Sequence, residues 1–303
     1  MKKLPLYVAG LALIAAFLAA YVAWCTSKPP FHRWEAPPVL VEVLTSGGLV
    51  SGDAFWDRFP EFILYADGST IVKRDNVDGR YTRQLLNARL SAAEVCDLLE
   101  QIESDGFLDF DPLQTPTTTP PGVYYQMIDS GYSRLTVNAW HSRAWWGWNF
   151  HAVLGYEPAR NSGQVPSFVL DTFTRLLNYE LLDAQPYELE RVKAIIISPF
   201  EGPLVSQWPF TIPTLAELYA HADPYAYSQT WGDTTTRVAV FEGNDARRLY
   251  ASIGDRAMAD YVENGIGYRV LIYPLAPLQN PQSLPGEFPF PNTPKTTLEC
   301  VVQ

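Results

Sequence analysis

The stretch Phe62–Lys73, FILYADGSTIVK, carries the strongest fold signal in the chain. Two runs rich in apolar and β-branched residues, 62–66 and 69–73, flank the dipeptide Asp67-Gly68. Both residues of such a dipeptide tolerate the positive φ angles of a tight hairpin turn. The stretch therefore predicts two antiparallel strands joined at this dipeptide.

A well-marked helix follows the hairpin. Ser91 and Glu94 form a capping box, in which each side chain accepts a hydrogen bond from a free backbone N–H at the helix start. From Val95 to Ile102 the apolar residues recur on one face at helical spacing, and Gly106 provides an end. An amphipathic helix is therefore expected between Ser91 and Gly106.

The other elements are expected from apolar periodicity along the chain. Further strands are predicted at 39–44, 81–86, 123–128, 135–140, 145–151, 189–198, 237–241 and 268–273. Further helices are predicted at 168–182, 215–221 and 245–253. Strict alternation of strand and helix begins only after residue 189. This order predicts an α+β fold, with helices on one face of a largely antiparallel sheet, and disfavours a doubly wound parallel sheet.

The N-terminal segment is long, apolar and uncharged. Residues 4–24, LPLYVAGLALIAAFLAAYVAW, would span about 30 Å as a helix, which is the thickness of the hydrocarbon core of a bilayer. The apolar region of a cleaved signal is shorter and ends in a small-x-small site, which this segment lacks. We therefore expect a single N-terminal transmembrane helix within residues 1–25. A cleaved signal and a lipoprotein with Cys25 as the lipidated residue are the alternatives.

Charge indicates how this helix is oriented. Residues 1–30 contain three lysines and no acidic residue, and the chain has a net charge of −11, which leaves −14 on the remainder. Lys2 and Lys3 precede the apolar segment. We therefore predict a single-pass protein of the cytoplasmic membrane, with the N-terminus inside and the bulk of the chain extracytoplasmic. The acidic balance excludes a nucleic-acid partner.

Proline-rich segments indicate the domain organisation. Residues 26–38 hold four prolines and are expected to form a stiff, extended spacer after the membrane segment. A main α+β domain is expected at 39–185, and a smaller α/β unit at 186–276, either separate from it or part of the same domain. Residues 277–303 are expected to form a Pro-rich C-terminal arm without regular structure, laid over the surface or loose.

The three cysteines, Cys25, Cys96 and Cys300, show no metal-binding spacing, so no metal site is expected. Two interpretations of Cys96 stay open. In an exported domain Cys96 and Cys300 can pair and tie down the C-terminal segment. Alternatively, Cys96 is a small buried apolar residue of the predicted helix.

The densest aromatic run is Trp140–His151, WHSRAWWGWNFH. On a strand, Trp146 and Trp148 would face one way, and Trp145 and His151 the other. Indole faces beside imidazole and amide groups suit a protein interface or the rings of sugars. The competing interpretation is that these rings pack in the core. Trp145, Trp146, Trp148 and His151 are therefore the candidate binding residues.

No catalytic signature was found: the chain lacks a nucleophile elbow, a phosphate-binding loop and a metal-ligand cluster, so no cofactor is assigned. We therefore expect a non-enzymatic, membrane-anchored extracytoplasmic protein. Its expected partners are the bilayer, through residues 4–24, and a membrane or envelope protein that it binds or serves as an accessory subunit. The alternatives are a glycan-binding or glycan-hydrolysing module that uses the aromatic run, and a structural envelope protein. No motif is specific enough to indicate a family.

Overall fold

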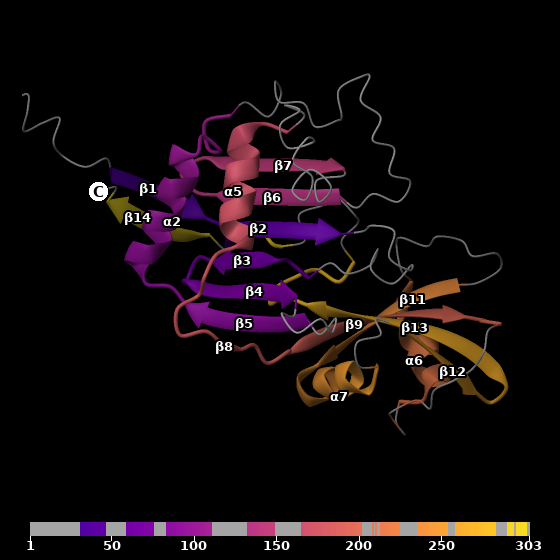
Figure 1. Ribbon diagram of the computed structural model, residues 1–303. Coiled ribbons are helices and arrows are strands. Elements are labelled where there is room, and N and C mark those ends of the chain that lie inside the picture. Colours follow the sequence, from indigo (N-terminus) through magenta and orange to yellow (C-terminus); the bar gives the residue numbers. More distant parts are fainter. Residues whose placement is uncertain are drawn as a thin grey trace, which may run out of the picture.

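The computed structural model is an α+β structure of antiparallel sheets and helices, which confirms the predicted fold class (Figure 1). It describes residues 31–46, 59–75, 83–110, 132–148, 165–201, 208, 210, 213–224, 235–253, 258–282, 290–293 and 295–301. Within these ranges there are three sheets and four helices.

The larger sheet has seven strands in the order β7-β6-β2-β3-β4-β5-β8, and every neighbouring pair is antiparallel. The predicted hairpin at Asp67-Gly68 lies at its centre, between β3 and β4. The strands are β2 (Val39–Ser46), β3 (Phe62–Tyr65), β4 (Ser69–Asp75), β5 (Arg83–Arg89), β6 (Tyr132–Asn138), β7 (Ser142–Trp148) and β8 (Gln185–Pro186).

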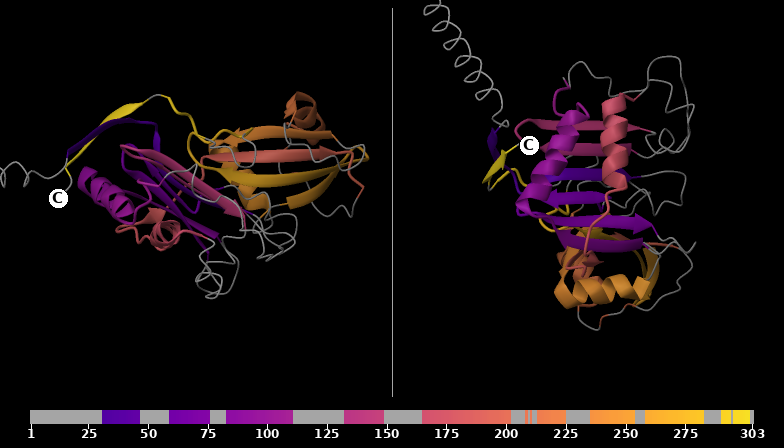
Figure 2. Two further views of the ribbon diagram at one scale, coloured as in Figure 1. Left: turned by 90° about the horizontal axis from the view of Figure 1, so that it is seen from above. Right: turned by 60° about the vertical axis from the view of Figure 1, so that its left-hand side comes forward.

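Two helices, α2 (Ala92–Ser104) and α5 (Ser167–Leu177), cover one face of this sheet (Figures 1 and 2). The capping box of Ser91 and Glu94 begins α2 as predicted. Apolar side chains of both helices and of the central strands form the main core under the helices. The arrangement of helices on one face is therefore the predicted one.

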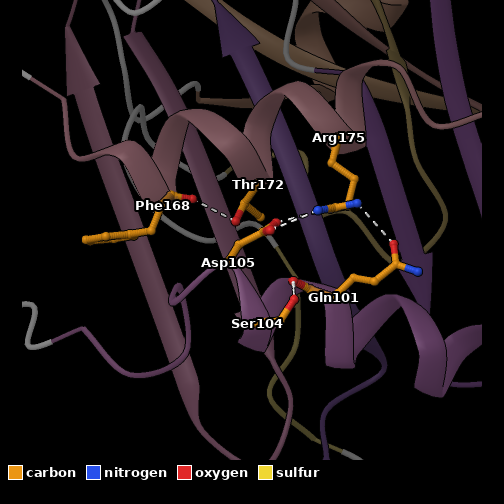
Figure 3. A network of polar contacts seen from close by, with 6 residues as sticks. All are labelled: Gln101, Ser104, Asp105, Phe168, Thr172 and Arg175. Carbon is orange, nitrogen blue, oxygen red and sulfur yellow. Dashed lines mark hydrogen bonds and ion pairs between the residues drawn. The ribbon is translucent and has the colours of Figure 1, made fainter. Parts of the chain in front are cut away.

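An ion pair joins the two helices at the end of α2 (Figure 3). Arg175 of α5 donates to both carboxylate oxygens of Asp105, at 2.8 and 3.1 Å, and to the side-chain oxygen of Gln101 at 3.2 Å. The hydrogen bonds to Asp105 raise the pKa of Arg175. This fork-shaped contact fixes the spacing of the helices over the sheet.

Helix α5 ends earlier than predicted. The sequence pattern extends to residue 182, but the helix stops at Leu177. Arg74 of β4 donates to the backbone carbonyls of Leu177, at 3.1 Å, and of Tyr179. A cation at the C-terminus of a helix satisfies free carbonyls and interacts favourably with the helix dipole. Beyond Leu177, Tyr179 and Leu181 still pack against the core without being helical, whereas Leu182 is exposed.

The turn between β3 and β4 depends on Gly68. This residue has φ of +85°, and a Cβ atom added to it would lie 2.2 Å from the backbone oxygen of Leu90. Gly68 also accepts a hydrogen bond from the Leu90 N–H at 2.9 Å, so the two backbones are in direct contact. No side chain fits between them.

The substitution Gly68→Ala is therefore expected to lower the free energy of unfolding by about 2–3 kcal/mol, from backbone strain and displacement of the Leu90 segment. Guanidinium unfolding of the full chain in mild detergent measures this change. Gly265→Ala is the matched control, because Gly265 has φ of +79° but nothing within 4 Å of the added Cβ. It should cost only about 1 kcal/mol. Equal losses for the two variants would refute the steric explanation.

The second sheet has five strands in the order β10-β11-β9-β13-β12, again all antiparallel. Helices α6 (Leu215–His221) and α7 (Gly243–Ile253) contribute to the apolar core on one of its faces. The predicted strict alternation of strand and helix is not observed, because among the described elements β10 is followed directly by β11 and β12 by β13, and every described pair is antiparallel, so the expected α/β unit is α+β instead. The strands are β9 (Arg191–Ser198), β10 (Asp223–Pro224), β11 (Thr235–Glu242), β12 (Met258–Glu263) and β13 (Ile266–Leu275).

The third sheet is a two-stranded ribbon of β1 (Phe31–Ala36) and β14 (Thr296–Val301). Phe31 lies opposite Val301 at one end, and Ala36 lies opposite Thr296 at the other. Residues 31–36, expected to belong to the spacer 26–38, are extended but paired. Residues 296–301, expected to belong to an irregular arm, likewise form a strand.

After β13 the chain crosses the face of the seven-stranded sheet that the helices leave uncovered. Ala276 and Phe290 pack there against buried residues of β2, β3 and β4. This part of the Pro-rich arm is therefore laid against the molecule, where it links the two larger sheets. Three side chains donate to its carbonyls: Tyr65 Oη to Pro277 at 3.0 Å, Arg191 Nη1 to Gln279 at 3.2 Å, and Lys193 Nζ to Pro281 at 3.3 Å.

Several predicted features lie outside the described residues. These are the transmembrane helix, Cys25 and the strand at 123–128. In the part of the chain that the structure describes, no helix combines the length and the apolar character needed to cross a bilayer.

Candidate functional site

Trp145 is a core residue. Its exposed fraction is 3 %, and its ring lies edge-on to that of Phe173 on α5, with centroids 6.0 Å apart. On β7 it stands opposite Leu135, another buried residue of the main core. This differs from the expectation that Trp145 contributes to an exposed binding patch. Through this indole, β7 packs against α5.

The other predicted binding residues are only partly placed. Trp146 and Trp148 occupy β7, opposite Arg134 and Tyr132 of β6. Their side chains lie outside what the structure describes, and so does the whole of His151. A binding role for these three residues therefore stays a prediction.

The structure brings together an aromatic group that the sequence analysis did not select, which we call the junction cluster: His32, Trp34, Glu103 and Trp140. His32 and Trp140 are stacked, with ring centroids 3.9 Å apart and planes 5° from parallel. Trp34 meets Trp140 edge-on at 5.4 Å. The Trp140 indole donates to Glu103 Oε1 at 2.8 Å, and His32 Nε2 lies 4.0 Å from the other oxygen.

The junction cluster is built from three separate elements. His32 and Trp34 come from β1, Glu103 from the end of α2, and Trp140 from the turn after β6. The Trp34 indole also donates to the Asn138 carbonyl at 3.4 Å. The cluster therefore attaches the β1–β14 ribbon to the sheet and to a helix at once. Each aromatic ring pair of this kind adds about 0.5–1.5 kcal/mol beyond its buried area.

A disulfide between Cys96 of α2 and Cys300 of β14 attaches the second strand of the same ribbon to α2. The two Cα atoms are 5.5 Å apart, and both cysteines are buried. Cys300 lies opposite His32 in the ribbon, so the disulfide and the His32–Trp140 stack attach the ribbon at the same position along its length. The structure thus has the paired arrangement, one of the two alternatives that the sequence left open.

Two ion pairs lie in the sheet face that the helices leave uncovered, one of them fully buried and the other largely so. Arg134 donates to both oxygens of Glu42, at 2.7 and 2.8 Å, and these side chains are 4 % and 0 % exposed. Lys73 lies 2.8 Å from Glu61. Each carboxylate has its own cation, and such pairing is what a buried charge requires. We interpret both pairs as structural.

Burial raises the pKa of two tyrosines beside the arm, Tyr65 and Tyr187, the latter to about 12. Both phenols are therefore protonated at neutral pH, and Tyr65 acts as a hydrogen-bond donor to the arm. Among the described residues no group of three or more His, Cys, Asp or Glu side chains is placed to hold a metal ion. The geometry supports attachment of the ribbon to the rest of the molecule, and among the described residues it assigns none to acid–base chemistry.

A signal for the junction cluster was present in the sequence. In FHRWEA, residues 31–36, His32 and Trp34 alternate with the charged Arg33 and Glu35. This is the period-two pattern of a strand with one buried face. The proline pairs on either side, 29–30 and 37–38, obscured this pattern, because they favour an unpaired spacer.

Comparison of the chain with protein-family models, with curated proteins and with solved structures found no match.

Proposed function

We propose that this protein is a membrane-anchored, extracytoplasmic binding protein that serves as an accessory subunit of a membrane or envelope assembly. The observation that carries the proposal is the Cys96–Cys300 disulfide. Disulfides form and persist in oxidising compartments outside the cytosol and are rare within it. A buried disulfide that joins the last strand of the described chain, β14, to α2 fits a domain that folds after export.

The N-terminal sequence supports the same location. The uncharged segment 4–24 is long enough to span a bilayer, and Lys2 and Lys3 precede it. β1 begins only seven positions after Trp24. The folded part is therefore attached to the membrane by a short connection, where an accessory subunit could act on a neighbouring membrane protein.

The glycan alternative receives less support from the structure. It used three indoles as a stacking platform, and Trp145 is buried under α5. The candidate residues still available to a glycan-binding site are Trp146, Trp148 and His151. A partner protein needs no such stacking platform, although the burial of Trp145 removes this indole from an aromatic protein interface as well.

Protease treatment of intact spheroplasts tests the location. The acidic domain should be digested without lysis, whereas a cytoplasmic marker protein should survive. Thiol counting with a maleimide mass tag, under denaturing and non-reducing conditions, should add one tag, to Cys25, of the three cysteines in the chain. Protection of the domain from protease, or three tags on the chain, would overturn the proposal.

Gentle solubilisation and affinity purification then test the subunit role. A membrane protein in fixed stoichiometry should accompany the full chain and be lost when the membrane segment alone is expressed. Recovery of the chain without any stoichiometric companion would remove the accessory-subunit part of the proposal and leave the location intact.

A further inference from the structure

We propose that the Phe31–Val301 end of the β1–β14 ribbon rests in the lipid headgroup layer of the membrane that residues 4–24 span. The partner of this surface is thus the bilayer itself. The inference rests on the proposed membrane anchor and goes beyond it, because an anchored domain can also stand clear of the lipid.

The length of the connection sets how far the ribbon can be from the membrane. Six residues, 25–30, separate Trp24 at the end of the apolar segment from Phe31 at the start of β1. Seven Cα-to-Cα steps cover at most about 25 Å when fully extended. Any bend in the connection brings the ribbon end closer to the headgroups.

The ribbon changes polarity along its length. Its first pair, Phe31 and Val301, is apolar. Two positions further on, Arg33 and Glu299 stand opposite each other and form an ion pair at 3.3 Å, with side chains 66 % and 52 % exposed. The interfacial zone of a membrane favours Trp and Tyr, and Tyr21 and Trp24 close the apolar segment that precedes the ribbon in the sequence, whereas exposed ion pairs favour water. The apolar end is therefore the end suited to lipid.

The ribbon cannot swing freely on the molecule. The junction cluster and the Cys96–Cys300 disulfide hold its two strands against α2 and the turn after β6. Figure 2 shows the ribbon at one end of the molecule and the five-stranded sheet at the other. Contact at the ribbon end therefore orients the whole structure, with the five-stranded sheet farthest from the bilayer.

Charge favours contact through the ribbon end alone. Outside residues 1–30 the chain carries a net charge of −14. Anionic headgroups repel such a surface, so the body of the protein has no electrostatic reason to lie flat on the membrane. Anionic headgroups do not repel Phe31 and Val301, because neither residue carries a charge.

Photo-crosslinking of the full chain in nanodiscs of phosphatidylcholine and phosphatidylglycerol tests the inference. The variant Phe31→benzoylphenylalanine should give a phospholipid adduct, detected by mass spectrometry. Glu35→benzoylphenylalanine is the matched control on the same strand, about 13 Å further from the ribbon end. Its lipid adduct should be about fivefold weaker, because the interfacial layer is thin. Asn244→benzoylphenylalanine, on α7 in the five-stranded unit, should give none.

The outcomes separate the two proposals. Equal adduct yields at positions 31 and 35, or no lipid adduct at position 31 in chain that resists alkaline extraction, would overturn the headgroup contact and leave the anchor standing. Release of the chain by alkaline extraction would overturn both. Val301→benzoylphenylalanine repeats the test from the other strand, and formation of the disulfide on a non-reducing gel verifies that each variant has folded.

Discussion

Removing the Cys96–Cys300 disulfide with the double substitution Cys96→Ala and Cys300→Ala should lower the free energy of unfolding by about 4–5 kcal/mol. The bond joins positions 204 apart in the sequence, so it closes most of the chain into one loop. Without it the unfolded chain gains the conformational entropy of that loop. The ribbon would also lose its covalent attachment to α2, and an isolated two-stranded ribbon is marginal in water.

Guanidinium unfolding of the full chain in mild detergent, followed by tryptophan fluorescence, measures this loss. Cys25→Ala is the control, because Cys25 precedes β1 in the sequence and lies outside the disulfide. It should leave the unfolding midpoint unchanged. A loss below about 1 kcal/mol in the double variant would mean that the ribbon opens locally and that the sheets unfold independently of it.

The single substitution Arg134→Met should lower the free energy of unfolding by about 3–5 kcal/mol. It would leave the Glu42 carboxylate, 0 % exposed, without its cation. The double variant Glu42→Leu with Arg134→Met removes both charges and should recover most of this loss, because well-packed apolar side chains replace a buried ion pair at little cost.

The control for this pair is the exposed ion pair Arg89–Asp67, in which the side chains are 72 % and 56 % exposed. Arg89→Met should change stability by less than about 1 kcal/mol, since water screens the remaining charge. If Arg134→Met costs no more than Arg89→Met, water reaches Glu42 and the buried assignment of the pair is wrong.

Local signals predicted much of the fold correctly. The hairpin at Asp67-Gly68 and the capping box of Ser91 and Glu94 each involve residues a few positions apart, so their physics is contained in a short stretch of sequence. The predicted end of α5 was wrong for the opposite reason, because the observed end depends on a residue far away in the sequence. Arg74, about a hundred positions away, satisfies the carbonyls at the helix end.

The ribbon shows the same limit more strongly. β1 and β14 pair across about 260 residues, and neither has a partner nearby in sequence that would mark it as a strand. One nearer signal was overlooked. Asn264-Gly265 is a tight-turn dipeptide, both residues have positive φ, and it joins β12 to β13. This hairpin was not among the predicted elements.

The candidate site was the least predictable part. A run of tryptophans looks alike in a core and on a surface, and only the position of α5 over β7 assigns Trp145 to the core. The junction cluster requires residues 32, 103 and 140 to meet. Such a meeting follows from the sheet order and not from any spacing along the chain.

The three donors Tyr65, Arg191 and Lys193 bind the crossing segment by its carbonyl oxygens. Proline has no N–H to offer, yet its carbonyl is the same as that of any other residue. The side chains of Pro277 and Pro281 can therefore vary while these donors stay fixed, whereas Ala276 and Phe290 are constrained by the core in which they are buried. The path of this segment over the sheets therefore depends on three distant side chains and two buried apolar residues, and little on its prolines.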